Sequence, residues 1–152
     1  METTARLLPE LQEWNNGNGI TSLDWLYTEA RSDFGVAFAD LFWPTFVEFE
    51  GYVFREGFSV DTVRSWEGNG TDRKGVEAAT NLLDTGDLFV PPGAEWSGLI
   101  EARAIHVGRI LAETYRAKLA RDFPGRTFCV EFYDGSEPGD DDIYVTFWQA
   151  PA

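Results

Sequence analysis

A long helical pattern followed by two alternating segments constrains the fold of this chain more than any other feature. Residues 97–122 repeat apolar side chains at the 3.6-residue period of an amphipathic helix, and a Phe-Pro-Gly break at residues 123–125 ends it. Residues 127–133 and 143–148 then place apolar side chains at every second position, which is typical of strands. We therefore expect the long helix to cover a sheet that contains both strands.

A second pair of strands is predicted earlier in the chain. Residues 45–57 alternate apolar and acidic side chains, and Glu50-Gly51 marks a turn within this segment. Because the strands come in adjacent pairs and do not alternate singly with helices, the sequence predicts the α+β class, with a four-stranded, mainly antiparallel sheet built from two hairpins. Further helices are predicted over residues 3–14, 21–35, 59–66 and 72–83.

Length and composition fit one domain. The chain has 152 residues, of which 43% are hydrophobic and 15% aromatic, and a chain of this length buries about two-thirds of its unfolded surface. No linker divides it, so we expect a single domain over residues 1–152. The N-terminal residues lack the features of a secretory signal, and no apolar run is long enough for a membrane span. Cys129 is the only cysteine, which fits the reducing cytoplasm.

The chain is strongly acidic, with 26 Asp and Glu against 12 Lys and Arg and a net charge of −14. Residues 101–126 hold six of the basic residues against three acidic ones, whereas residues 127–152 hold six acidic residues and no Lys or Arg. Such a charge repels nucleic acid and anionic membranes and attracts basic molecules. We therefore expect a basic protein partner, and neither nucleic acid nor a membrane.

Motifs that carry chemistry are missing from the sequence. It contains no phosphate-binding loop, no Gly-x-Gly-x-x-Gly and no Gly-x-Ser-x-Gly. His106 is the only histidine, which excludes a site with several histidine ligands. The sequence therefore predicts no catalytic residue, no metal site and no cofactor, and it favours a non-catalytic protein.

Carboxylates and aromatic side chains gather in two places that a partner would contact. One is the strand segment that contains Glu48 and Glu50, and the other is the predicted hairpin loop 134–142 with the strand after it. Aromatic anchors inside a charged rim are the anatomy of tight interfaces. The predicted contact residues are Glu48, Glu50, Glu137, Asp140, Asp141 and Asp142, with Tyr144 and Trp148 as anchors.

These observations favour an acidic protein-binding module whose partner is basic, analogous in charge and size to an immunity protein that inhibits a cationic toxin. Two alternatives remain open. The first is a small enzyme or ligand-binding domain with an aromatic pocket, in which Glu48 or Glu50 serves as acid or base and Arg103 or Arg109 binds an anionic substrate. The second is a structural or oligomerising protein whose acidic surface is an adaptation to salt.

Overall fold

The computed structural model describes residues 2–90 and 92–151. They fall into two compact units, Met1–Ala39 and Asp40–Ala152. The expectation of one domain over residues 1–152 stays a prediction. No helix among the described residues is long and apolar enough to cross a membrane.

The first unit is helical. It contains α1 (Glu2–Leu7), the 3-10 helix η1 (Pro9–Glu13), α2 (Ser22–Glu29) and most of α3 (Ser32–Phe42), whose last residues belong to the second unit. The predicted helix over residues 3–14 is broken before Pro9, because proline has no N–H to continue the α-helical hydrogen bonds and instead begins η1.

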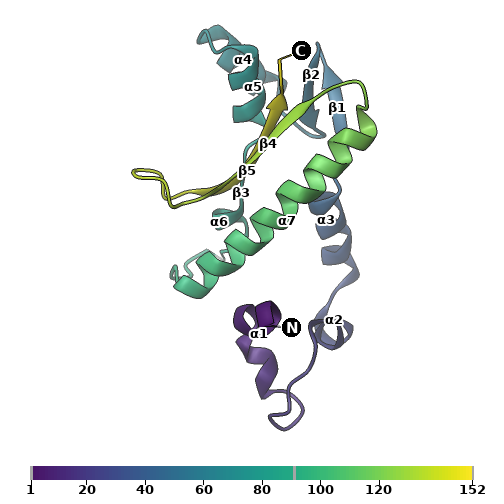
Figure 1. Ribbon diagram of the computed structural model, residues 1–152, viewed down its shortest axis with the longest axis vertical. Helices are drawn as coiled ribbons and strands as arrows, with labels where there is room; N and C mark the ends of the chain where they lie inside the picture. Colours follow the sequence, from purple (N-terminus) through teal and green to yellow (C-terminus); the bar gives the residue numbers. More distant parts are fainter. Residues whose placement is uncertain (1, 91, 152) are drawn as a thin grey trace. The chain divides into compact units, whose positions relative to one another are not determined.

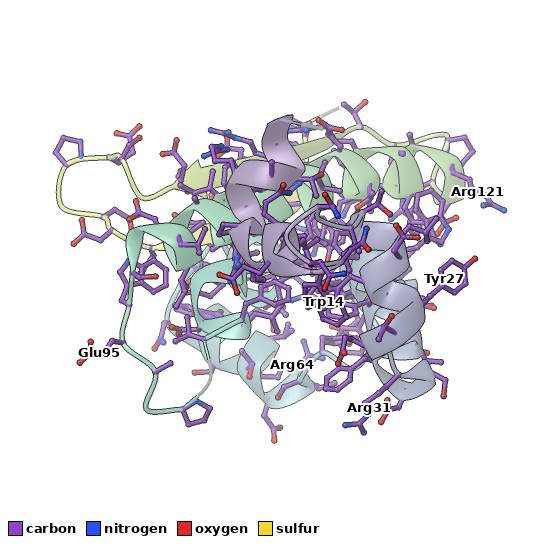
Figure 2. All side chains as sticks on the ribbon, turned by 90° about the horizontal axis from the view of Figure 1, so that it is seen from below. Trp14, Tyr27, Arg31, Arg64, Glu95 and Arg121 are labelled. Carbon is purple, nitrogen blue, oxygen red and sulfur yellow. The ribbon has the colours of Figure 1, made fainter. Side chains whose placement is uncertain are left out.

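A capping box starts α2. The Thr21 hydroxyl accepts a hydrogen bond from the backbone N–H of Asp24 at 3.1 Å, and the Asp24 carboxylate accepts one from the backbone N–H of Thr21 at 3.1 Å. The predicted helix over residues 21–35 is two helices, because Ala30 adopts an extended conformation at the end of α2. Tyr27 is among the apolar and aromatic side chains of α2 that remain exposed, and it extends outward from the helix (Figure 2).

The second unit confirms the α+β class (Figure 1). After the end of α3, its elements in chain order are β1 (Phe46–Phe49), β2 (Tyr52–Arg55), α4 (Val60–Gly68), α5 (Arg73–Thr80), β3 (Leu83–Asp84), α6 (Thr85–Leu88), α7 (Gly98–Asp122), β4 (Phe128–Asp134) and β5 (Ile143–Gln149). Ser59, Asp72 and Ser97 cap α4, α5 and α7 through side-chain oxygens. Both predicted hairpins, β1–β2 and β4–β5, are present and antiparallel.

The predicted four-stranded sheet is wrong. The described residues form a two-stranded sheet of β1 and β2, and a separate three-stranded antiparallel sheet in the order β3-β5-β4. The third strand, Leu83–Asp84, lies at the end of the segment predicted as the helix over residues 72–83, and it pairs with Val145 and Tyr144 of β5. The two hairpins therefore do not join through backbone hydrogen bonds.

Two buried polar side chains, Glu77 of α5 and Asn81 at the C-cap of α5, bind the edges of both sheets instead. Glu77, 2% exposed, accepts hydrogen bonds from the backbone N–H of Val53 in β2 at 2.8 Å and of Gln149 in β5 at 2.7 Å. Asn81, 1% exposed, donates to the carbonyl oxygens of Val53 at 3.0 Å and Phe147 at 3.4 Å. We call this pair, Glu77 and Asn81, the α5 clamp. It satisfies backbone groups that direct pairing of β2 with β5 would otherwise use.

Helix α7 covers one face of the three-stranded sheet, and α5 contacts the opposite face of β5. Val145 and Phe147 pack into a core with Leu111 and Tyr115 of α7, whereas the Thr146 hydroxyl donates to the carbonyl of Ala78 in α5 at 2.6 Å. The predicted division of β5 into two faces is thus confirmed. The approach of α7 to the sheet is close at one point.

That point is Gly108, where a Cβ would lie 2.4 Å from the Phe132 ring and 3.2 Å from the Thr85 hydroxyl. Glycine is the residue that permits this contact between helix and sheet.

Glu77→Gln tests the α5 clamp. The replacement puts an amide N–H₂ where a carboxylate oxygen accepts a backbone N–H, so one buried donor faces another and loses its partner. We expect a loss of about 1–3 kcal/mol in the free energy of unfolding, measured by urea denaturation. Glu113→Gln, an exposed position on α7, is the matched control and should change stability by less than about 0.5 kcal/mol. Equal stability of the two variants would contradict the clamp.

Candidate functional site

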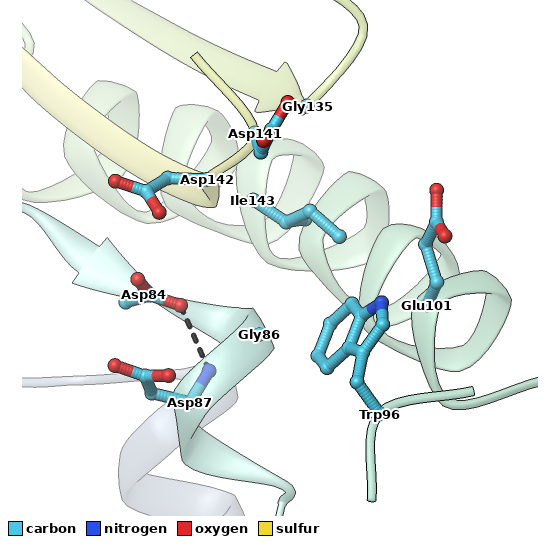
Figure 3. Close-up of a pocket in the computed structure, with 9 residues that line it drawn as sticks. All are labelled: Asp84, Gly86, Asp87, Trp96, Glu101, Gly135, Asp141, Asp142 and Ile143. Atoms are coloured by element: carbon cyan, nitrogen blue, oxygen red, sulfur yellow. Dashed lines mark hydrogen bonds between the residues drawn. The ribbon is translucent and has the colours of Figure 1, made fainter. Parts of the chain in front are cut away.

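An acidic pocket lies beside the β4–β5 hairpin in the second unit. Its volume is about 450 Å³, which is within the usual range of small-molecule sites. Figure 3 shows Asp84, Asp87 and Asp142 on one side of it and Trp96 and Glu101 on the other. The lining residues are Asp84, Gly86, Asp87, Trp96, Glu101, Gly135, Asp141, Asp142 and Ile143.

The segment from β3 into α6 builds one wall. Asp84 caps α6, because its Oδ1 accepts a hydrogen bond from the backbone N–H of Asp87 at 2.8 Å, and the two carboxyl groups lie on the same side of the pocket (Figure 3). The buried hydroxyl of Thr85 lies 3.2 Å from the carbonyl oxygens of both Ala104 and Ile143. Thr85 therefore links α6 to α7 and to β5, which form the other walls of the pocket.

The hairpin loop between β4 and β5 builds the second wall. Gly135 has a φ of 77°, and a Cβ on it would lie 2.8 Å from the carbonyl oxygen of Asp141. The two sides of the loop thus approach closely at this glycine, which places Asp141 next to the residue that follows the end of β4. Asp140 accepts a hydrogen bond from the backbone N–H of Asp142 at 3.1 Å, which shapes the turn before β5.

The start of α7 and the residue before its cap complete the pocket. Trp96 immediately precedes the Ser97 cap, and Glu101 lies in the first turn of the helix. The indole of Trp96 lies beside Gly86, with a ring carbon 3.5 Å from the position that a Cβ of Gly86 would take. Trp96 is 50% exposed, so its ring is available to a molecule in the pocket. Glu95, the residue before it, extends away from the ribbon (Figure 2).

The negative charges of this pocket form no ion pairs among the described residues. Within the described part of the chain, the ion pairs that involve α7 and the two hairpins are formed by other carboxylates, and none of the five acidic pocket residues takes part in one. Like charges held together repel one another. The pocket therefore favours an incoming cation.

A stacked pair of tyrosines supports the base of the hairpin loop. The rings of Tyr133 in β4 and Tyr144 in β5 lie 4.5 Å apart between centroids. Tyr133 donates a hydrogen bond to the Glu131 carboxylate, and this bond, with burial as the second cause, raises the pKa of Tyr133 to about 12. Burial, followed by the charge of Asp140, raises the pKa of Tyr144. Both hydroxyls thus keep their protons over a wide pH range.

Of the predicted contact residues, Asp141 and Asp142 line the pocket. Glu137 is exposed in the loop, and Asp140 is turned toward Tyr144, whose hydroxyl lies 3.4 Å from a carboxylate oxygen of Asp140. The structure therefore brings part of the predicted acidic set together around one site.

Glu48 and Glu50 lie on the other hairpin, and each pairs with its own arginine. Arg126 donates to the Glu48 carboxylate at 2.6 Å, and Arg64 of α4 donates to that of Glu50 at 2.7 Å. Glu50 is in the turn, with a φ of 50°, and does not continue the face of β1 on which Glu48 lies. The hydrogen bonds from Arg64 are the main cause that lowers the pKa of Glu50. Arg64 is seen in Figure 2.

Trp148, the second predicted anchor, is 7% exposed. The ammonium group of Lys74 lies 4.6 Å from the centroid of its ring, so a side chain of α5 covers it. Its role as an anchor stays a prediction, and its burial leaves little of the ring for a partner to contact.

Sequence reasoning missed Asp84, Asp87, Trp96 and Glu101. Two local signals were available. Asp84-Thr-Gly-Asp87 has the spacing of a capping aspartate followed by an acidic residue in a first turn, and Trp96 stands next to a strong helix start. Neither signal indicates that these two segments lie beside the hairpin loop. The three segments are distant in the sequence and come together only in the folded chain.

Removal of the Glu131 carboxylate tests what raises the pKa of Tyr133 at the base of the loop. Because the folded-state pKa of Tyr133 is raised above its ordinary value, the stabilisation from its bound proton is complete below about pH 10 and is lost as the pH rises toward 12. Glu131→Gln should lower the pKa of Tyr133 toward about 10. Tyrosinate absorbance, compared with that of Tyr133→Phe at each pH while circular dichroism shows a folded chain, reports this pKa. An unchanged midpoint in Glu131→Gln would contradict the assignment.

Known proteins do not supply a function for this pocket. The sequence matches no protein family, and comparisons with curated proteins and with solved structures found no significant similarity. Across the residues that the structure describes, no three or more His, Cys, Asp or Glu side chains are grouped so that they could hold a metal ion. The chemistry of the site must therefore be inferred from its own residues.

Proposed function

We propose that this protein is a non-catalytic binding module for a basic protein partner, and that the acidic pocket receives a Lys or Arg side chain of that partner. The observation that carries the proposal is that five carboxylates, none of which forms an ion pair among the described residues, line one pocket together with the exposed Trp96. The analogy is with an immunity protein that covers a cationic toxin.

The pocket offers a cation two favourable interactions. Carboxylates from β3, α6, α7 and the hairpin loop surround it, so an ammonium or guanidinium group would be attracted from several sides. The indole of Trp96 adds an aromatic surface over which such a cation is stable. A charged side chain that is buried on binding needs these compensating contacts, since it gives up its hydration.

Long-range electrostatics support the same class of partner. The net charge of −14 attracts a basic protein before contact, and residues 127–152 contribute six acidic residues without a Lys or Arg. Steering of this kind raises the association rate and weakens as salt is added. Glu137 and Asp140, in the same loop as the pocket residues, would act chiefly on this rate.

The proposal places the protein in the cytoplasm, which the free thiol of Cys129 supports. The enzyme alternative has less support, because Glu48 and Glu50 pair with Arg126 and Arg64 and line neither wall of the acidic pocket. A salt-adapted surface would not require an aromatic side chain among the carboxylates of one pocket.

Affinity capture from lysate of the source cell, with the double variant Asp141→Asn and Asp142→Asn beside the wild type, tests this function. We expect the wild type to retain a basic protein at low salt and release it as the salt concentration rises toward 1 M. Affinity of the double variant for that protein should fall about tenfold by calorimetry, because two carboxylates of the pocket are neutral. Trp96→Ala should weaken binding with little change in the association rate.

The matched control is the double variant Asp61→Asn and Glu113→Gln. It removes the same charge from exposed positions on α4 and α7 that do not line the pocket. It should slow association slightly and leave the dissociation rate unchanged. A partner that binds both double variants with equal affinity, or the absence of any basic partner at low salt, would overturn the proposal.

A further inference from the structure

Strand β4 has a free outer edge. It lies at one end of the order β3-β5-β4, so β5 is its one strand neighbour among the described residues (Figure 1). β4 is seven residues long, whereas β3 has two residues and β1 and β2 have four each. It is therefore the longest edge strand in the part of the chain that the structure describes.

The register of the hairpin shows which backbone groups of β4 face outward. The carbonyl of Thr127 accepts a hydrogen bond from the N–H of Ala150 at 2.9 Å, so these two residues form a hydrogen-bonded pair. Antiparallel pairs alternate between bonded and non-bonded, and the next residue and every second one after it therefore point their N–H and C=O groups away from β5. These residues are Phe128, Val130, Phe132 and Asp134. The partners of the first two in β5, Gln149 and Phe147, turn their own groups to the α5 clamp, as this alternation requires.

Most of these outward groups are unpaired. Arg116 of α7 donates to the carbonyl of Val130 at 2.9 Å, and the N–H groups of Phe128, Val130 and Phe132 have no hydrogen-bond partner among the described residues. Proteins usually protect such an edge with proline, lysine, a bulge or a covering segment. The sequence of β4, Phe-Cys-Val-Glu-Phe-Tyr-Asp, has no proline or lysine, and its register with β5 has no bulge. The edge is thus suited to pairing with another strand.

The side of β4 that faces α7 suits apolar side chains of an added strand. Phe128, Val130 and Phe132 pack against the core there. Two cations of α7 lie beside them, since the Arg109 guanidinium is 5.9 Å from the centroid of the Phe132 ring and Arg116 binds the carbonyl of Val130. These cations would repel a basic side chain on this side of an added strand.

The opposite side of β4 suits basic side chains. It carries Glu131, whose carboxylate accepts a hydrogen bond from Tyr133 and forms no ion pair among the described residues. Opposite charges at facing positions of neighbouring strands stabilise their pairing. Gly135, the residue after the end of β4, lines the acidic pocket (Figure 3). A strand added along β4 would therefore lead to the carboxylates of that pocket.

A second copy of this chain does not fit the edge. Each copy carries a net charge of −14, so two copies repel each other. Pairing of β4 with itself over its whole length would also place the Glu131 carboxylates of the two copies opposite each other, and like charges at facing positions are destabilising. A basic segment has neither disadvantage.

We propose that the basic partner binds by adding an extended segment to the outer edge of β4 as an antiparallel strand. Its alternate side chains would be apolar toward α7 and basic toward Glu131. This inference rests on the proposed function, because it takes the same partner and extends its contact from the acidic pocket along β4. Backbone hydrogen bonds supply the affinity of such strand addition, and the alternate side chains supply its specificity.

Hydrogen exchange at the backbone amides of the full chain, followed by nuclear magnetic resonance, tests the added strand. The probe is a seven-residue peptide that alternates lysine and valine, with lysine at both ends. We expect it to slow exchange at Phe128, Val130 and Phe132, whereas Cys129 and Glu131, which already pair with β5, should exchange slowly with and without it. Absence of binding, or binding without slower exchange at the outward amides, overturns the proposal. Slow exchange of these amides without peptide, increasing with protein concentration, would identify a second copy as the occupant and would also overturn it.

Two methylated forms of the peptide test its register. In an antiparallel pair, the peptide residues that bond to the outward groups of β4 have their side chains on the α7 side, so they are the valines. N-methylation of the valines removes these donors and should weaken binding at least about tenfold, whereas N-methylation of the lysines should leave the affinity unchanged. Equal affinity of the two forms, or tighter binding of the valine-methylated form, would contradict the proposed pairing.

Variants of the protein assign the binding to this edge. Glu131→Gln removes the carboxylate that faces the lysines and should weaken peptide binding about threefold. Asp61→Asn, which removes one negative charge from an exposed position on α4, is the matched control and should bind as the wild type does. Arg116→Ala frees the carbonyl of Val130 and removes a cation beside the strand, so it should strengthen binding. Wild-type affinity in both Glu131→Gln and Arg116→Ala would overturn the assignment.

The double variant Asp141→Asn and Asp142→Asn separates this inference from the proposed function. Equal protection of the β4 amides by the peptide in this variant and in the wild type would support the added strand and count against the pocket alone. Peptide-induced shifts confined to the amides of the pocket residues, without slower exchange along β4, would overturn the added strand and leave the pocket as the contact.

Discussion

The α5 clamp is the interaction on which the second unit depends. Two hairpins formed by distant parts of the sequence present their edges to each other, and Glu77 and Asn81 accept and donate the hydrogen bonds between them. The Gln149 side chain extends the network, because its Nε2 donates to Glu77 at 2.6 Å and to the carbonyl of Gly51 at 2.8 Å. A buried carboxylate is unfavourable unless it is fully hydrogen-bonded, so the clamp stabilises this arrangement only while all of its partners are in place.

The acidic pocket is positioned through this clamp. Glu77 and Asn81 fix the end of β5, and the start of the same strand carries Ile143 beside the acidic loop residues of the pocket. Asn81 also accepts from the backbone N–H of Arg55 and so holds the end of β2.

The sequence predicted local structure well and the contacts between segments poorly. The Glu50-Gly51 turn, the helix starts near residues 59, 72 and 97 and the alternation in β5 depend on neighbouring residues, and the structure has all of them. The four-stranded sheet was wrong because a glutamate in a helix is ordinarily a solvent-facing residue, and nothing local shows that Glu77 is buried between strands. The acidic loop was predicted as a contact surface, but Asp84, Trp96 and Glu101 join it only through the fold. Glu48 and Glu50 were chosen for their charge, which arginines distant in sequence neutralise.

Native-state hydrogen exchange at the backbone amides of Val53 and Gln149 tests the central claim most directly. These two N–H groups belong to different sheets, and both donate to the same Glu77 carboxylate. If the clamp joins the hairpins into one cooperative unit, both amides exchange only when the whole unit unfolds, and their free energies of opening are equal. Exchange of either amide by local opening, at a lower free energy than amides paired within its own hairpin, would show that the two hairpins are held together by something other than α5.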